Sequence, residues 1–218
     1  MGFYAPLWSP RFSGSSFYSS DNSHFLCTVT GALWTSLGRT FDRDNDYITM
    51  PQAVSQSLTG KDSATLLMWV KQTVIDGTAQ SLFFIQNSSI GAARLFLSVA
   101  ATTGVISGGG RSSDSGSAQS GNGSTLVVGG FHLVGMTMDL PNQTIDVWYD
   151  TTKTSTTGLA FAESTFQNTT RAGDVIGNNP GFTADFGGTI GEVLLSAPKL
   201  SDGVIEAWRY ATKWRYGA

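Results

Sequence analysis

Cysteine and charged residues are scarce in this 218-residue sequence, and each scarcity excludes a class of protein. Cys27 is the single cysteine, so the chain has no intrachain disulfide and no set of thiolates that could bind zinc. We expect this thiol to be buried as a small apolar group. Charged residues make up 13% of the chain, and its 13 Lys and Arg form no basic cluster. Nucleic acid is therefore not expected as a partner.

Long hydrophobic runs are also absent. No stretch approaches the ~20 consecutive apolar residues that cross a membrane. The N-terminal sequence MGFYAPLWSP has neither a basic region nor a continuous apolar region, which a secretory signal peptide would need. The sequence therefore predicts no transmembrane segment and no signal peptide, and we expect a soluble product made in the cytoplasm.

Paired acids of the kind used in glycoside hydrolysis are missing as well. That chemistry uses two carboxylates about 5 to 9.5 Å apart. The three glutamates are Glu163, Glu192 and Glu206, and none lies two or three residues from another acid on one strand face. On this evidence we predict that the protein is not an enzyme.

Glycine, serine and threonine are abundant instead. The chain has 26 Gly, which suits many short strands joined by turns of small residues. Its length fits one sandwich of ordinary size, so we expect a single domain over residues 1–218. Thr65 to Lys71 and Thr189 to Ser196 have apolar residues on both strand faces, which indicates buried, central strands.

Two further segments are informative. Ser201 can cap a helix, and the apolar residues Val204, Ile205 and Trp208 follow at helical spacing. A short helix is therefore predicted after the last strand. Residues 108–124 read GGGRSSDSGSAQSGNGS and contain almost no apolar surface. We expect them to form a long mobile loop.

Several motifs occur in an order that resembles the laminin-G-like, concanavalin A-like domains. The matching stretches are TVTGALW from Thr28 to Trp34, FDRDNDYI from Phe41 to Ile48, WVK from Trp69 to Lys71, and TIGEV from Thr189 to Val193. The resemblance covers nearly the whole chain. It implies an all-β fold, a two-sheet antiparallel jelly-roll sandwich with a short C-terminal helix.

Relatives of this kind often bind Ca²⁺ at one end of the sandwich, which the resemblance makes a candidate cofactor here. Oxygen ligands gather at Asp42, Asp44 and Asp46, and partners from a second loop would be Asn178 and Asp185. A plain turn is the alternative, because Asp and Asn side chains often cap their own backbone. We keep both interpretations for this cluster.

Aromatic side chains offer the other candidate site. Lectin-like sandwiches hold sugar rings on exposed aromatic faces. Trp148 lies on the alternating face of a predicted hairpin, and Trp214 lies beyond the predicted helix. We take these two as candidate ligand-binding residues, with packing as the alternative for each.

The resemblance supports two hypotheses of function. The first is a virion surface protein, such as a capsid decoration, tail or fibre component of a tailed phage. Such a protein would form homo-oligomers, bind other virion proteins and also bind a glycan on the host. The second is a carbohydrate-binding, lectin-like module, with or without calcium. Neither hypothesis includes nucleic acid or a membrane as a partner.

Overall fold

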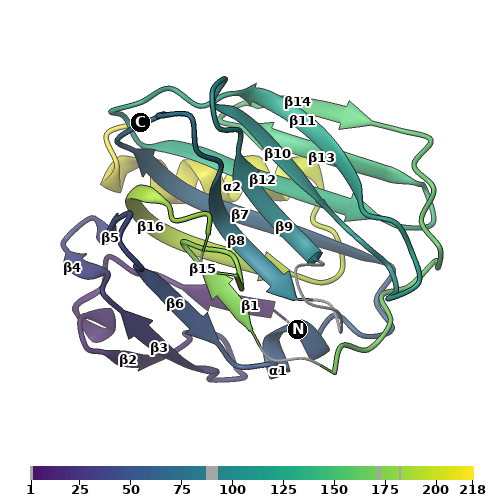
Figure 1. Cartoon of the computed structure of the whole chain (residues 1–218), viewed down its shortest axis with the longest axis horizontal. Helices are drawn as coiled ribbons and strands as arrows, with labels where there is room; N and C mark the ends of the chain where they lie inside the picture. The colour runs from purple at the N-terminus through teal and green to yellow at the C-terminus, as the bar shows by residue number, and fades with distance from the viewer. Residues whose placement is uncertain (1, 87–92, 171–172, 182) are drawn as a thin grey trace.

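The computed structural model describes residues 2–86, 93–170, 173–181 and 183–218 (Figure 1). Two antiparallel sheets of eight strands each face one another across an apolar core. A short helix, α2 (Asp202–Thr212), follows the last strand. The predicted all-β jelly-roll sandwich with a short C-terminal helix is therefore confirmed.

Each sheet has its own spatial order of hydrogen-bonded strands. Sheet A consists of β14 (Thr152–Thr156), β13 (Thr144–Tyr149), β12 (His132–Asp139), β7 (Ser63–Gln72), β16 (Gly187–Ser196), β5 (Gly38–Asp42) and β4 (Leu33–Thr35), with β1 (Gly2–Ala5) also paired to β16. Sheet B consists of β11 (Gln119–Thr125), β10 (Val105–Gly110), β9 (Ala93–Val99), β8 (Gln80–Gln86), β15 (Asp174–Ile176), β6 (Tyr47–Met50), β3 (Leu26–Thr30) and β2 (Ser16–Tyr18). The described residues also form the short helical segments η1 (Pro10–Phe12), α1 (Ala53–Gln56) and η2 (Lys213–Arg215).

Strand β7 shows why the two sheets stay together. Its even-numbered residues, such as Leu66 and Met68, point into the core between the sheets. Leu67 and Trp69 point to the other side of sheet A, into a second apolar cluster. Both faces of the strand are therefore buried, as its sequence predicts. Cys27 is buried too, and burial raises the pKa of its thiol to about 12.

Helix α2 covers the outer face of sheet A. The Ser201 side chain accepts a hydrogen bond from the Val204 amide at the start of the helix, as expected for an N-cap. Ile205 is buried against the second cluster, and the Trp69 indole donates to Thr212 Oγ1 at 2.7 Å. Figure 1 shows α2, in yellow, against sheet A on the side away from β8, β9 and β10.

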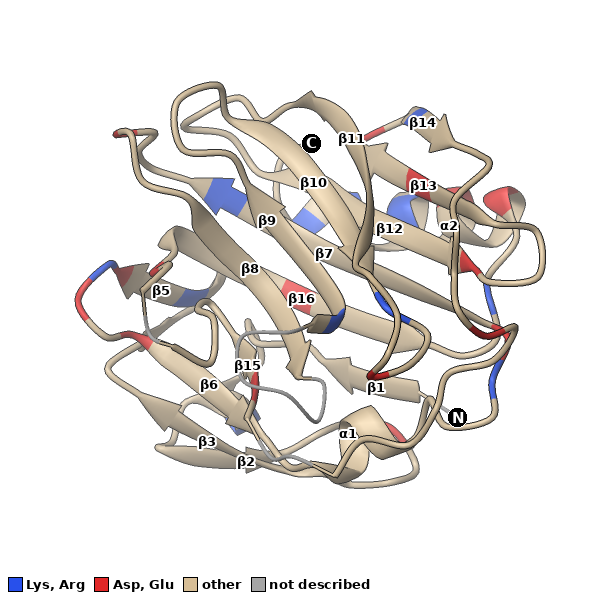
Figure 2. Cartoon of the chain, turned by 45° about the vertical axis from the view of Figure 1, so that its right-hand side comes forward, with Lys and Arg blue, Asp and Glu red and all other residues tan. Residues whose placement is uncertain are grey.

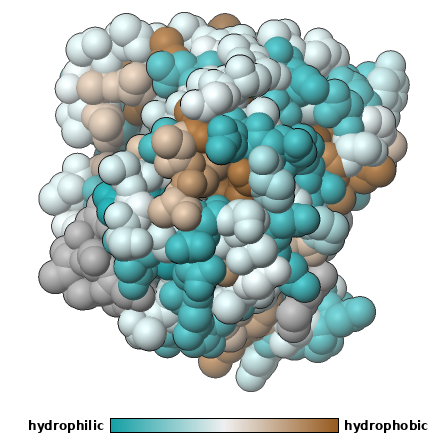
Figure 3. Space-filling model, turned by 90° about the vertical axis from the view of Figure 1, so that its right-hand side faces the viewer, coloured by the Kyte–Doolittle hydropathy of each residue, from teal (hydrophilic) through white to brown (hydrophobic). Residues whose placement is uncertain are grey.

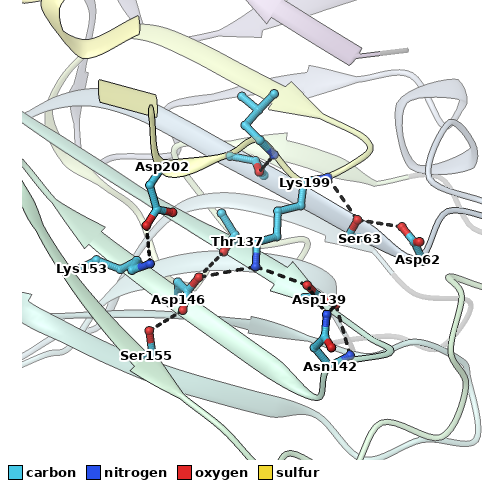
Figure 4. A network of polar contacts seen from close by, with 12 residues as sticks. Asp62, Ser63, Thr137, Asp139, Asn142, Asp146, Lys153, Ser155, Lys199 and Asp202 are labelled. Carbon is cyan, nitrogen blue, oxygen red and sulfur yellow. Dashed lines mark hydrogen bonds and ion pairs between the residues drawn. The ribbon is translucent and has the colours of Figure 1, made fainter. Parts of the chain in front are cut away.

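A network of hydrogen bonds and ion pairs holds the segment that leads into α2 (Figure 4). Lys199 Nζ lies 3.3 Å from Asp139 Oδ2 and 3.9 Å from Asp146 Oδ2. At the helix start, Lys153 Nζ lies 2.6 Å from Asp202 Oδ2. Burial raises the pKa of Asp139, but hydrogen bonds from Asn142 and Lys199 outweigh it, and the net pKa is lowered. The network therefore contains an ionised carboxylate and joins β12, β13 and β14 to α2.

Only residues 111–118 of the long mobile loop predicted over 108–124 lie outside strands. Gly108 to Gly110 belong to β10, and Gln119 to Thr125 form β11. Glycines are needed here because sheet A packs closely against these strands. A Cβ on Gly108 would lie 2.9 Å from Met136 Cβ, and one on Gly123 would lie 2.6 Å from Val147 Cγ1. The prediction was wrong for the strand residues because these contacts join residues far apart in the sequence, and composition does not show them.

The charged residues are dispersed over the fold. Figure 2 shows Lys and Arg scattered among Asp and Glu over both sheets, which agrees with the absence of a basic cluster in the sequence. On the face shown in Figure 3, hydrophobic residues form small separate patches between hydrophilic ones. Within the described part of the chain, no helix has the length and apolar character needed to cross a membrane.

Candidate functional site

The outer face of sheet B carries a pair of aromatic side chains. Phe84 on β8 and Phe96 on β9 are direct cross-strand partners. Their sequence neighbours, such as Phe83 and Leu97, point into the core, so the alternation of the strands directs these two rings outward. Both rings are partly buried. Side chains directly opposite each other are close enough to form one continuous apolar surface.

A glycine on the neighbouring strand leaves space for the Phe96 ring. Gly109 on β10 is the cross-strand partner of Phe96. A Cβ at Gly109 would lie 2.9 Å from ring atoms Cε1 and Cζ of Phe96 and 2.3 Å from the Gln119 carbonyl oxygen. Both distances are too short for a real side chain. The absence of a side chain here therefore lets the Phe96 ring lie over β10.

The two rings line a shallow hollow with a volume of about 250 Å³. Its remaining walls are small or polar, and the polar ones are Gln80, Ser81, Ser98, Arg111 and Asn179. A concave apolar surface with a few polar groups is the usual form of a small-molecule site. Its small volume suits one compact ring rather than a large ligand.

Most of these polar groups already have partners in the protein. The Gln80 side chain accepts from the Gly187 amide at 2.9 Å and donates to the Val74 carbonyl at 2.7 Å. Asn179 is bonded to Thr183 through both ends of its amide. Ser81 is different, because it is 4% exposed and its Oγ has no hydrogen-bond partner among the residues that the structure describes.

Arg111 brings a positive charge to the hollow. Within the described ranges, no carboxylate lies within ion-pair distance of its guanidinium. The neighbouring Arg94 is paired with Asp114 at 2.9 Å. Burial lowers the pKa of Arg94, Asp114 raises it, and the nearby Arg111 charge lowers it. Two guanidinium groups thus lie near one another, and Asp114 is paired with Arg94.

The loop that carries Arg111 is fastened to the body of the protein. The Arg111 amide donates to the Arg94 carbonyl at 3.2 Å. Ser112 accepts from two amides of a distant segment, from Glu163 through its Oγ at 2.9 Å and from Gln167 through its carbonyl at 2.8 Å. Arg111 is therefore held in place at the edge of the hollow.

The predicted calcium ligands lie in two loops whose charges affect each other. Burial raises the pKa of Asp46, hydrogen bonding from the Asp42 amide lowers it, and the charges of Asp42 and Asp185 raise it. The described residues contain no group of three or more His, Cys, Asp or Glu side chains placed to hold a metal.

The oxygens of this cluster serve the loops themselves. Asp46 Oδ2 accepts from the Asp42 amide at 2.8 Å, and Asp42 Oδ1 accepts from the Asp44 amide at 2.9 Å. Asn178 donates to Asp185 and accepts from the Asn179 amide at 2.8 Å. These are the bonds of capped turns, the alternative that the sequence left open. Calcium binding by the oxygens that remain stays a prediction.

The two predicted tryptophans lie in different surroundings. Trp148 is 3% exposed and packs in the apolar cluster beneath α2, so its ring faces are covered. Trp214 is 70% exposed, and the Arg215 guanidinium lies 4.7 Å from its ring centre. Neither residue lines the hollow on sheet B. Ligand binding by them stays a prediction, with an accessible ring at Trp214 alone.

Phe84, Phe96 and Arg111 were missed by the sequence analysis. RLFLS alternates, so Phe96 shares a strand face with Arg94 and Ser98, whereas SLFFIQ has four consecutive apolar residues and does not mark Phe84 as outward. Which outward residues face each other depends on the pairing of the strands, and that register is not visible in the sequence.

Comparison with known families agrees with this fold. A family model described as the concanavalin A-like lectin/glucanases superfamily matches residues 42–206. The chain belongs to this superfamily. The resemblance noted from the sequence motifs is confirmed at that level, whereas a phage-virion context is not shown. Among curated proteins, none matches the chain.

Solved structures share the fold at low sequence identity. Trypanosoma rangeli sialidase in complex with sialic acid has a TM-score of 0.72 and 14% identity, covering 99% of this chain and 33% of the sialidase. A mutant of NanB sialidase from Streptococcus pneumoniae has a TM-score of 0.60 and 16% identity, covering 77% of this chain and 26% of the other. The chain thus spans a third or less of these two enzymes.

A third structure concerns binding to glycolipids. Botulinum neurotoxin type C, whose cell entry is dependent upon interaction with two ganglioside molecules, has a TM-score of 0.52 and 10% identity, covering 97% of this chain and 46% of the toxin. At these identities the likeness shows the fold alone.

The sequence-based exclusion of enzymatic activity was wrong, because the fold that these matches show is also the fold of enzymes. Structures that share the fold include sialidases and a sialidase mutant displaying trans-sialidase activity. The exclusion considered acids on a single strand face, and that criterion is too narrow. The sheet brings together acids from neighbouring strands, such as Asp139 on β12 and Asp146 on β13, which share Lys199.

Proposed function

We propose that this protein binds carbohydrate in the hollow on the outer face of sheet B. The observation that carries the proposal is the opposed pair Phe84 and Phe96, which presents two partly buried rings beside polar side chains. A sugar ring has an apolar face of C–H groups and a rim of hydroxyls, so it is complementary to such a surface. Membership of the superfamily, and neighbours in complex with sialic acid or interacting with gangliosides, support it.

The test is a glycan array followed by calorimetry on any sugar that binds. Phe96→Ala removes one ring from the hollow, and we expect it to weaken binding about tenfold or more. Tyr18→Ala is the matched control, because Tyr18 is a 62% exposed aromatic on β2, at the opposite edge of the same sheet. Binding that survives Phe96→Ala in a variant that unfolds like the wild type would contradict the proposal.

Trp214→Ala separates this proposal from the sequence-based one. Loss of binding in Trp214→Ala, with binding intact in Phe96→Ala, would place the site beyond α2 instead. The bound sugar should also be assayed for release of a product, since the fold is shared with sialidases. A released sugar would add a hydrolytic activity to the binding proposed here.

The virion-surface role is a finer hypothesis that the comparisons do not support. Partners among capsid or tail proteins and a homo-oligomeric state also stay predictions. Sedimentation of the purified chain tests the oligomer directly, and a single monomeric species would contradict it.

A further inference from the structure

We propose that the sugar held on sheet B is acidic, and that Arg111 binds its carboxylate. The inference rests on the proposed function and names the class of ligand for the same hollow. It starts from Arg111, which lines the hollow and whose guanidinium has no carboxylate within ion-pair distance among the described residues. Its Nε is buried and has no hydrogen-bond partner there either.

The charges around the hollow favour an anion. Asp114 is engaged with Arg94, so it does not neutralise Arg111 as well. Asp185 follows the lining residue Ala184 and is itself not a lining residue; its carboxylate accepts a hydrogen bond from Asn178. A guanidinium presents parallel N–H donors that match the two oxygens of a carboxylate, and such charge-assisted pairs are the stronger hydrogen bonds in proteins.

A second group completes the recognition. Ser81 lines the hollow and is 4% exposed, and its buried hydroxyl has no hydrogen-bond partner in the described part of the chain. A buried hydroxyl without a partner is unfavourable, and rotation of the Ser81 side chain toward the hollow would let a ligand hydroxyl or carboxylate oxygen satisfy it. With the rings of Phe84 and Phe96 against the C–H face, the three features together fit a single sugar acid, of the sialic or uronic acid class.

The experiment compares sugars that differ in one charge. Calorimetry would measure the methyl glycoside of N-acetylneuraminic acid against its methyl ester, and methyl glucuronide against methyl glucoside. We expect the free acids to bind at least tenfold more tightly than their neutral partners, with affinity that falls as salt is added. Arg111→Gln should reduce binding of the acids about tenfold to a hundredfold and reduce that of the neutral sugars much less.

Two variants control for charge and for geometry. Arg11→Gln makes the same change of charge on η1, which contacts β2 at the far edge of sheet B, and should leave binding unchanged. Arg111→Lys keeps the charge without the parallel donors and should bind the acids with intermediate affinity.

The outcomes separate this inference from the function on which it rests. Equal binding of acidic and neutral sugars, abolished by Phe96→Ala, would overturn the acidic class and keep carbohydrate binding. Acid binding that Arg111→Gln does not weaken would likewise overturn the role of Arg111. If none of these sugars, nor any glycan on the array, binds to the wild-type protein, both proposals fail.

Discussion

The Trp8 indole donates a hydrogen bond of 2.7 Å to Glu192 Oε1 across 184 residues of sequence. Glu192 lies in β16, is buried, and also pairs with the Arg215 guanidinium. That guanidinium lies 4.2 Å from the centre of the Trp8 ring, so each of the three side chains contacts the other two. It joins the N-terminal segment and the C-terminal end of the chain to the middle of sheet A.

Glu192→Gln tests what this contact contributes. Removing one member of a buried ion pair leaves the other charge without compensation, and Arg215 is still partly exposed to water. We therefore expect a loss of about 2–3 kcal/mol in the free energy of unfolding, measured in urea. Glu206→Gln removes a half-exposed carboxylate on α2 and should cost less than about 0.5 kcal/mol. Equal losses in the two variants would contradict the special role of Glu192.

Asp174 should make stability depend on pH. Burial raises the pKa of Asp174 to about 7, while hydrogen bonds from the Gln86 and Ser55 amides at 2.9 and 3.1 Å lower it. Because the folded pKa is above the unfolded value, the carboxyl stabilises the fold fully below about pH 4. This contribution, on the order of 4 kcal/mol, is lost as the pH rises to about 7.

Asp174→Asn isolates that effect. Asparagine does not ionise, so the wild type should lose stability relative to the variant between about pH 4 and 7. Urea unfolding of both proteins across this range measures the difference. A difference that is constant with pH would show that the Asp174 carboxyl has the same pKa in the folded and unfolded chain.

The sequence predicts those elements of the fold that depend on patterns among residues close in sequence. Leu66 and Leu67 on opposite faces of β7 already indicate a strand buried on both sides, and Ser201 followed by Ile205 indicates the capped helix that covers it. These features depend on residues close in sequence, so periodicity and capping are sufficient to find them.

The candidate site depends on contacts that local pattern does not contain. Phe84 and Phe96 become a pair through the register of β8 and β9, and Gly109 becomes necessary because the Phe96 ring lies against it. The glycines of β10 and β11 look like a flexible linker until Met136 and Val147 of sheet A are placed against them. Composition alone therefore predicted the wrong structure for residues 108–110 and 119–124.

Thermal unfolding can test the predicted calcium binding by the loops of Asp42 to Asp46 and Asn178 to Asp185. An ion bound to the folded state alone would raise the midpoint of thermal unfolding as calcium is added. Asp185→Asn should remove that rise, and magnesium at the same concentration is the control because it requires a tighter octahedral geometry. An unchanged midpoint in millimolar calcium would favour the capped turns and contradict the ion site.

Gly109→Ala links the packing of sheet B to the proposed site. The added methyl group would meet the Phe96 ring at 2.9 Å and the Gln119 carbonyl at 2.3 Å, so the ring and the β10–β11 pairing must both shift. We expect a loss of about 1–3 kcal/mol in the free energy of unfolding together with weaker sugar binding. Gly203→Ala is the control, because a Cβ there meets nothing within 4 Å and lies in α2, where alanine is favoured over glycine by about 0.5–1 kcal/mol. If Gly109→Ala lost stability but bound sugar like the wild type, the position of the Phe96 ring would not matter for binding, and the hollow would not be the site.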